Sequence, residues 1–318
     1  MLVNADKPQR WKADVRQSVD YYNHWFLTFA PQTFRETRIE TTKQVESALE
    51  QTENLTRITT QIIQERPHVL AMLRMATAPP LARDRLVGLA GVTRNLIDNI
   101  EKRHRMPPRI DQIELVHQLA KIVDIIERLL DTDIFPWLDM HQPPTPDTLH
   151  RAAMIVADRL CGTVADPIIR NAQEQRQLEK IEAWLTRHNY RQVSNVSDVR
   201  EMPSGTFSFR VTIAVTHTNT DRHINIPIDA VIMPHNATIG DLPMLIEAKS
   251  AGDFANTNKR RKEEATKIHQ LRHTYGDNVR FILFLCGYFD SGYLGYEAAE
   301  GIDWVWEHRI DDLAEFGL

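Results

Sequence analysis

Two carboxylates and one lysine stand at the ends of two apolar segments of the sequence. Asp229 follows the alternating run INIPI, and Glu247 and Lys249 follow the apolar run LPMLI with only Ala248 between them. A charge at the end of a buried strand is costly unless it is paired, bound to metal or open to a cleft. Because side chains alternate between the faces of a strand, Glu247 and Lys249 would project on one side of a sheet.

The same alternation would bring Asp229 to that side if the two strands are neighbours. We expect the apolar residues around Asp229 to share the opposite face of their strand. That set is Ile226, Ile228 and Ala230. The corresponding set around Glu247 is Met244, Ile246 and Ala248.

Two converging carboxylates and a lysine suit metal-dependent hydrolysis. Mg²⁺ takes carboxylate oxygens and keeps water and phosphate oxygens in its other positions. A metal held by Asp229 and Glu247 would activate water and neutralise charge on a phosphodiester. Lys249 would then orient or deprotonate that water, or stabilise the developing charge. The alternative is structural, since an E-x-K triplet is common and most such triplets are solvated or salt-bridged strand ends.

The second half of the chain alternates in the way that strands do. In TFSFRVTIAV the apolar residues occupy every second position, which predicts a strand with one buried face. Those residues are Phe207, Phe209, Val211, Ile213 and Val215. The order from residue 168 is a helix to about 188, three strands, a basic helix at about 257–275 and an apolar strand at 279–287. This order predicts an α/β core with a mixed sheet. Trp304 and Trp306 are expected in its interior.

The first half has helical periodicity. We expect a first helix that ends at Pro31, followed by helices at about 33–65, 68–76, 82–104, 110–131 and 147–160, several of them separated by prolines. We predict a helical region at 1–165, serving dimerisation or DNA-site recognition or both, and a catalytic core at 166–318.

Composition restricts the class of protein. The 318 residues carry a net charge of −5, but Lys249–Arg280 has eight Lys or Arg against four acids, so a basic segment lies beside the carboxylates. No signal peptide and no membrane-spanning run is recognisable, which predicts a cytoplasmic protein without a membrane partner. Cys161 and Cys286 are expected to be reduced core residues.

PID at 227–229 and EAK at 247–249, within this order of helices and strands, resemble the PD-(D/E)xK nuclease superfamily. The longer runs IEAKSAGDFANTNKRRKEEATKIHQLRHTYG and ADPIIRNAQEQRQL are similar to the XamI-type family of type II restriction endonucleases. The resemblance covers about residues 160–318 and is less diagnostic in the helical first half. Ile228 departs from the motif by separating Pro from Asp, but the metal needs only the carboxylate.

The resemblance implies a restriction-endonuclease-like core in which Asp229 and Glu247 bind Mg²⁺ and Lys249 is the catalytic lysine. It also implies a further carboxylate from the first core helix. Glu174 is the best candidate, with a solvated helix residue as the equal alternative. The implied reaction is cleavage of double-stranded DNA at a short palindromic site. The implied partners are a second copy of the chain and a cognate DNA methyltransferase that is not a stable subunit.

The basic helix at 257–275 begins with a run of cations. Cations at a helix start oppose the helix dipole, which is reasonable if DNA phosphates lie there. The candidate DNA contacts are Asn256, Asn258, Lys259, Arg260 and Arg261. A solvated helix end is the alternative. A weaker second cluster consists of Lys102, Arg103, Arg105 and Arg109.

Two other functions fit the same residues. A repair or recombination nuclease with this core would depend on DNA ends or structure instead of a short site. A DNA-binding regulator would bind without needing Asp229 or Lys249 and would cut nothing.

Overall fold

The computed structural model describes the chain except for residues 1, 141, 195, 217–222, 239 and 256, and except for the side chains of residues 223 and 258–261. The chain divides into two compact units. One consists of Met1–Phe29 and Arg170–Leu318, and the other of Ala30–Ile169. Among the described residues, no helix combines the length and the apolar character that a membrane span requires.

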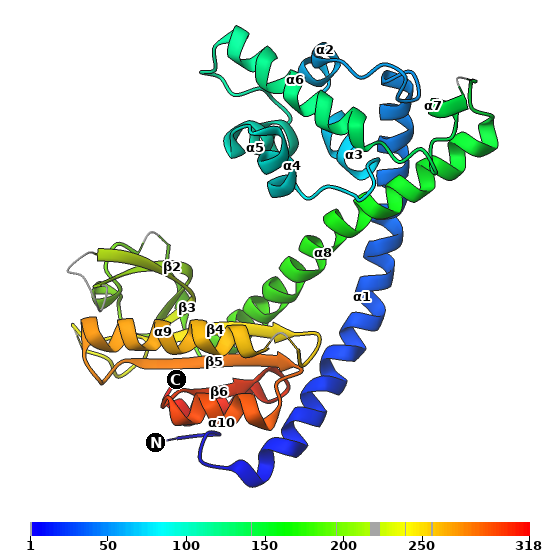
Figure 1. The fold of residues 1–318 in the computed structure, drawn as a ribbon. Coiled ribbons are helices and arrows are strands. Elements are labelled where there is room, and N and C mark those ends of the chain that lie inside the picture. The colour runs from blue at the N-terminus through cyan, green and yellow to red at the C-terminus, as the bar shows by residue number, and fades with distance from the viewer. Residues whose placement is uncertain (1, 141, 195, 217–222, 239, 256) are drawn as a thin grey trace. The chain divides into compact units, whose positions relative to one another are not determined.

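The first unit is built on a six-stranded sheet in which the strands lie in chain order (Figure 1). Its strands are β1 Arg191–Gln192, β2 Thr206–Thr216, β3 His223–Met233, β4 Met244–Ala251, β5 Arg280–Gly287 and β6 Asp303–Trp306. β2, β3 and β4 pair antiparallel, whereas β4, β5 and β6 pair parallel, as β1 does with β2. The predicted α/β class with a mixed sheet is therefore confirmed.

Helices cover both faces of this sheet. On one face, α9 (Thr257–Tyr275) and α10 (Ser291–Ala299) pack against the sheet, with Ile268 and Leu294 in one apolar cluster with Leu283 of β5. On the other face, Trp184 of α8 (Pro146–Arg187) and Leu313 of the 3₁₀ segment η2 (Glu307–Phe316) belong to a second cluster. Trp304 and Trp306 are fully buried, as predicted.

Strands β2 and β3 change face in mid-strand, which the sequence pattern did not indicate. Ile226 and Ile228 pack on the α9 side, whereas Ala230 packs on the α8 side, so the expectation that these three share a face is wrong. The single buried face predicted for 207–215 is wrong for the same reason. Arg210, at the point of change, has a left-handed backbone with φ of +52°. It lies between Phe209, which pairs with Ala230, and Val211, which pairs with Ile228.

The long helices do not end where prolines predict. α1 runs from Pro8 to Gln51 through Pro31, and α8 continues through Pro167. A proline removes one helical hydrogen bond, but packing along a long helix outweighs that loss. Residues 2–29, assigned from the sequence to the helical region, instead belong to the sheet unit. Ser18 Oγ accepts the Gly287 N–H at 2.8 Å.

The regular elements among the described residues of the second unit are helices, apart from one isolated bridge. Besides parts of α1 and α8 it contains α2 Thr60–Glu65, α3 Val69–Met75, α4 Arg83–Ala90, α5 Arg94–Arg103, α6 Gln112–Leu129 and α7 Trp137–Met140. The single helix predicted at 82–104 is wrong, because Gly91 takes a left-handed conformation and divides it into α4 and α5. Cys161 and Cys286 are buried and unlinked, as expected.

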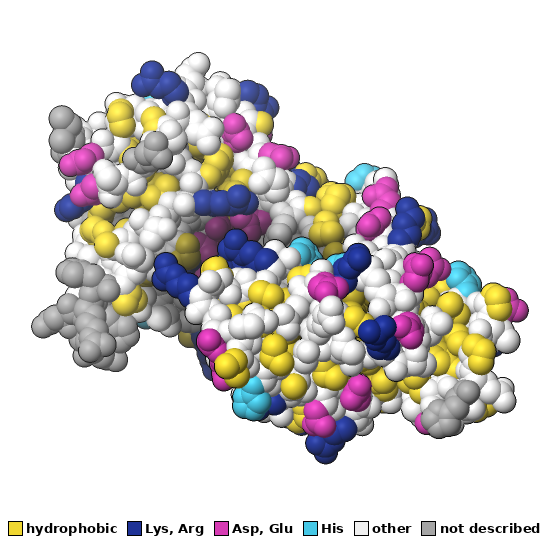
Figure 2. Space-filling model, turned by 90° about the horizontal axis from the view of Figure 1, so that it is seen from above, with side chains coloured by type: hydrophobic (Ala, Val, Ile, Leu, Met, Phe, Trp, Pro, Cys, Tyr) yellow, Lys and Arg dark blue, Asp and Glu magenta, His cyan; other side chains and the backbone are white. Residues whose placement is uncertain are grey.

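Charges of both signs are distributed over the surface. Figure 2 shows Lys and Arg side chains interspersed with Asp and Glu on the face that it displays. A sequence segment with an excess of cations therefore does not by itself define a binding surface.

Candidate active site

Asp229 and Glu247 meet across the junction of β3 and β4. The strand pairing aligns Ala230 with Ile246, and one further step of the same register sets Asp229 opposite Glu247. There the Asp229 side chain binds the backbone of β4, because its Oδ2 accepts the N–H of Ala248 at 2.9 Å. The structure thus brings the two predicted carboxylates together.

Two lysines and a third carboxylate complete the cluster. Lys249 Nζ donates to Glu247 Oε1 at 3.0 Å and lies 3.3 Å from Oε1 of Glu264, which projects from α9. Lys267, also on α9, places its Nζ 2.8 Å from Glu247 Oε1. Glu247 is 6% exposed and Glu264 only 1%, so these charges interact with little screening by water.

Burial and mutual repulsion set the protonation of Asp229. Burial and, second to it, the negative charge of Glu247 raise its pKa from 3.8 to about 6, against the opposing effects of the Ala248 N–H and Lys249. A bound cation would relieve both penalties, because it favours the ionised carboxylate. The energetic cost of keeping Asp229 charged is therefore a sign that the site suits a metal ion.

Lys249 is held as a cation. Burial alone would lower its pKa, but the neighbouring Glu247, Glu264 and Asp229 outweigh that effect, so the pKa of Lys249 is raised above its usual value. A protonated lysine cannot accept a proton from water. Of the roles expected for Lys249, orienting water or stabilising negative charge fits this environment better than general-base catalysis does.

The donor set fits a hard divalent cation. Glu247 Oε2 is buried and has no hydrogen-bond partner among the described residues, although a buried carboxylate oxygen normally has one. Together with Asp229 it offers the two carboxylates that Mg²⁺ commonly uses in phosphate chemistry. In the described part of the chain no three His, Cys, Asp or Glu side chains converge as a ready metal-binding group, so waters or phosphate oxygens would fill the other positions.

Glu174 lies near this cluster but has another partner. It accepts from Arg210 Nη2 at 3.1 Å, and its charge contributes to raising the pKa of Asp229. Glu174 would have to leave Arg210 to join a metal, and its role as a third ligand remains a prediction.

The candidate DNA contacts at the start of α9 stay untested by the structure. Asn256 lies outside the described residues, and the side chains of Asn258, Lys259, Arg260 and Arg261 are likewise not described.

Sequence reasoning missed the contribution of α9 to the site. Glu264 and Lys267 were not singled out, yet Glu264 precedes Ile268 by four residues and Leu271 by seven, so it lies on the apolar stripe of that helix. A charged residue on a buried stripe is a recognisable signal. Gln177 of α8 was missed too. Its amide donates to the Lys249 carbonyl at 3.3 Å and the Phe284 carbonyl at 3.1 Å, which fixes the end of β4.

Replacing Asp229 by asparagine is expected to stabilise the metal-free protein above pH 6. Because the pKa of Asp229 is raised in the folded state, wild-type stability falls as pH rises from about 4 to about 6. The uncharged amide of the variant would avoid this loss, which is at most about 3 kcal/mol. Denaturant unfolding in EDTA at pH 4 and pH 7.5 measures it. An equal gain at both pH values, or a similar gain for Asp20→Asn on exposed α1 surface, would contradict the explanation.

Comparisons with known proteins identify the family of the chain. Residues 53–306 match the family model described as XamI restriction endonuclease. The type II restriction enzyme SalI of Streptomyces albus G is 53% identical over 318 residues, covering 99% of this chain and 100% of that protein. A search of solved structures found no significant match. Since the family model covers most of the chain and the relative matches it throughout, the chain belongs to the XamI restriction endonuclease family.

Proposed function

We propose that this type II restriction endonuclease cuts double-stranded DNA at a short palindromic site with Mg²⁺ held by Asp229 and Glu247. One observation carries the assignment of the site. Asp229, whose pKa is raised, lies beside Glu247, whose Oε2 is buried without a hydrogen-bond partner among the described residues. Both features are costly in the protein alone, and a divalent cation removes both costs.

Each side chain then has a distinct task. When bound, the metal would polarise the scissile phosphate and lower the pKa of water. Asp229 and Glu247 would hold it through their carboxylate oxygens. The Lys249 ammonium, oriented by Glu247 and Glu264, stabilises the charge that develops on the phosphate oxygens. Lys267 neutralises Glu247 until the metal binds.

The wider system follows from the reaction. A palindromic site has two equivalent strands, and one chain supplies one such cluster, so a two-fold homodimer is the simplest assembly that cuts both. A cognate DNA methyltransferase would protect the host's own sites. Light scattering of the complex with a site-containing duplex would measure two chains per duplex. One chain per duplex, with nicked DNA accumulating first, would contradict the dimer.

The form of the DNA substrate separates this proposal from a repair or recombination nuclease. With Mg²⁺, a covalently closed plasmid is expected to become linear at the same rate as a linear fragment carrying the same site is cut. Degradation that requires a free end or a branched structure would favour a repair enzyme. Binding without any cleavage would favour a regulator.

A further inference from the structure

Two short helices of the second unit are joined by a corner of three residues, 91–93. α4 ends at Ala90, Gly91 adopts φ of +59° and ψ of +40° and donates its N–H to the Val87 carbonyl, and α5 begins at Arg94. Glycine reaches this left-handed conformation without the steric cost of a side chain. The Thr93 hydroxyl then caps α5 by accepting the Leu96 N–H at 3.3 Å. Two helices joined by a three-residue turn containing glycine is the arrangement of a helix-turn-helix.

Apolar side chains fix this corner on one side only. Leu86 of α4 and Leu96, Ile97 and Ile100 of α5 are at most 1% exposed and belong to one core cluster. The opposite face of α5 is polar, and Arg94, Asn95 and Lys102 are exposed on it. The second helix is therefore anchored by its apolar side and presents amide and cationic groups outward.

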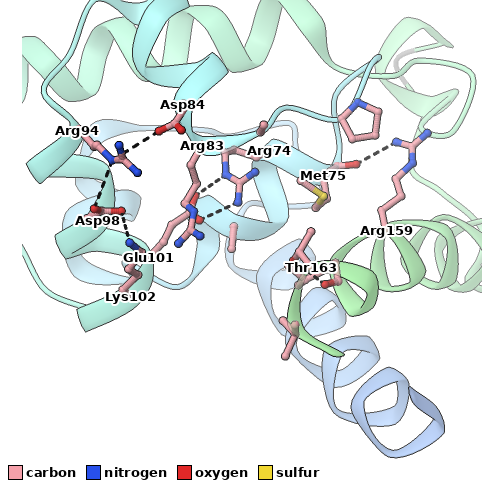
Figure 3. A pocket seen from close by; sticks show the side chains of 15 residues that line it. Arg74, Met75, Arg83, Asp84, Arg94, Asp98, Glu101, Lys102, Arg159 and Thr163 are labelled. Carbon is pink, nitrogen blue, oxygen red and sulfur yellow. Dashed lines mark hydrogen bonds and ion pairs between the residues drawn. The ribbon is translucent and has the colours of Figure 1, made fainter. Parts of the chain in front are cut away.

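Residues of α5 line two cavities. A cavity of about 740 Å³ includes Arg94, Asp98 and Lys102 in its lining (Figure 3), and one of about 490 Å³ includes Asn95 and Asn99. Residues along α5 line both cavities, on two sides of the helix. The major groove of B-DNA is wide enough to admit an α-helix, and α5 has an exposed polar face.

The charge of the surroundings suits a polyanion. Between residues 83 and 109 there are seven Lys or Arg and three Asp or Glu, a net charge of +4. One of those acids, Glu101, is occupied by the buried Arg74, whose Nη2 donates to it at 2.8 Å (Figure 3). Arg83 and Arg85 at the start of α4 are exposed, where the first helix of such an element crosses the DNA backbone.

We propose that α4, the turn at 91–93 and α5 form a DNA-reading helix-turn-helix element in which Arg94 and Asn95 contact base edges. The inference rests on the proposed function, since it names the part of the chain that selects the site. N-terminal residues of the second helix make the base contacts in this arrangement. Arginine pairs with the O6 and N7 of guanine, and asparagine with the N6 and N7 of adenine.

The present contacts of Arg94 and Asn95 leave both side chains able to bind base edges. Arg94 is 70% exposed and forms ion pairs with Asp84 at 3.6 Å and Asp98 at 3.9 Å, and such solvent-exposed pairs contribute little free energy. Asn95 Oδ1 accepts from Asn99 Nδ2 at 3.0 Å. That hydrogen bond uses one of the two lone pairs of Oδ1, so the other lone pair and both Nδ2 donors remain for a base edge.

Substitutions in the full-length protein test the inference. The DNA site is first defined by the cleavage products of the wild type, and each variant is then assayed on duplexes that carry this site or a version of it with one base pair changed. Arg94→Ala and Asn95→Ala are each expected to slow cleavage of the site by roughly 10- to 100-fold and to weaken discrimination at one base position. Arg94→Lys keeps the charge but not the planar fork, so it should be as poor as Arg94→Ala.

Arg128→Ala is the matched control, since Arg128 is 71% exposed and also forms an ion pair within its helix. It is expected to cut as the wild type does. Unchanged discrimination in the Arg94 and Asn95 variants overturns the inference and leaves the proposed function standing. Full recovery in Arg94→Lys also overturns it, because that result indicates a phosphate contact. Failure of the wild type to cut any defined site contradicts the proposed function itself.

Discussion

Asp229→Asn is expected to lower DNA cleavage by at least roughly 10³-fold at saturating Mg²⁺, while the protein stays folded. The substitution keeps the size of the side chain and an oxygen that can accept the Ala248 N–H, which Asp229 binds at 2.9 Å. It removes the charge that would hold the metal. Single-turnover cleavage of a duplex carrying the site measures the loss.

The matched control is Asp20→Asn, which changes an exposed aspartate of the same unit and should cut normally. Combined with the stability experiment, Asp229→Asn gives effects of opposite sign: a more stable metal-free protein above pH 6 and an inactive enzyme. A variant that is stabilised and still cuts at the wild-type rate would show that the buried charge of Asp229 destabilises the protein and has no role in cleavage.

Lys249→Met is expected to slow cleavage by roughly 10²- to 10³-fold with little change in DNA affinity, because the ammonium stabilises charge that develops only in the transition state. The methionine keeps the length and much of the apolar volume of the lysine stem. Comparing the single-turnover rate with the equilibrium affinity for the same duplex separates catalysis from binding.

Lys267→Met provides the comparison within the same cluster. Lys267 reaches the same Glu247 oxygen and is 17% exposed, against 21% for Lys249. It contacts Glu247 and the Pro227 carbonyl, whereas Lys249 also lies beside Glu264. We expect a less than about tenfold loss for Lys267→Met. An equal loss in the two variants would mean that the cluster needs total positive charge and assigns no special task to Lys249.

The sequence predicted those parts of the site that depend on period-two alternation near the ends of strands. The helix predicted at 257–275 matches α9, and Asp229, Glu247 and Lys249 converge as expected. The predictions for α9 and for Glu247 and Lys249 succeeded because a single helix or strand already determines which face a side chain occupies. Asp229 meets Glu247 although β3 changes face beside it, so alternation along that strand does not account for its position. Their chemical roles rest on the family and on the experiments above.

Other parts could not be predicted from local patterns. The change of face at Arg210 depends on a left-handed residue that is not glycine, a conformation that tertiary structure must impose. Pro31 and Pro167 lie inside long helices, because packing on both sides of a proline outweighs its local preference. The position of Glu174 beside Arg210 links a helix to a distant strand, and periodicity carries no information on such a contact.

The division of 82–104 into two helices is different, because its signals were present in the sequence. Gly91 is a typical helix terminator, and Thr93, three residues before Leu96, is a typical helix N-cap. The uninterrupted apolar periodicity around them favoured one long helix. Periodicity alone therefore does not indicate the corner at residues 91–93.

The most direct test of the account is to sequence the ends produced from a closed circular plasmid by the wild type and by Asp229→Asn, in Mg²⁺ and in EDTA. We expect every wild-type end formed in Mg²⁺ to lie at one short sequence, and no ends above background in EDTA or with the variant. Ends scattered without a common sequence, or the same ends from Asp229→Asn at the wild-type rate, would contradict it.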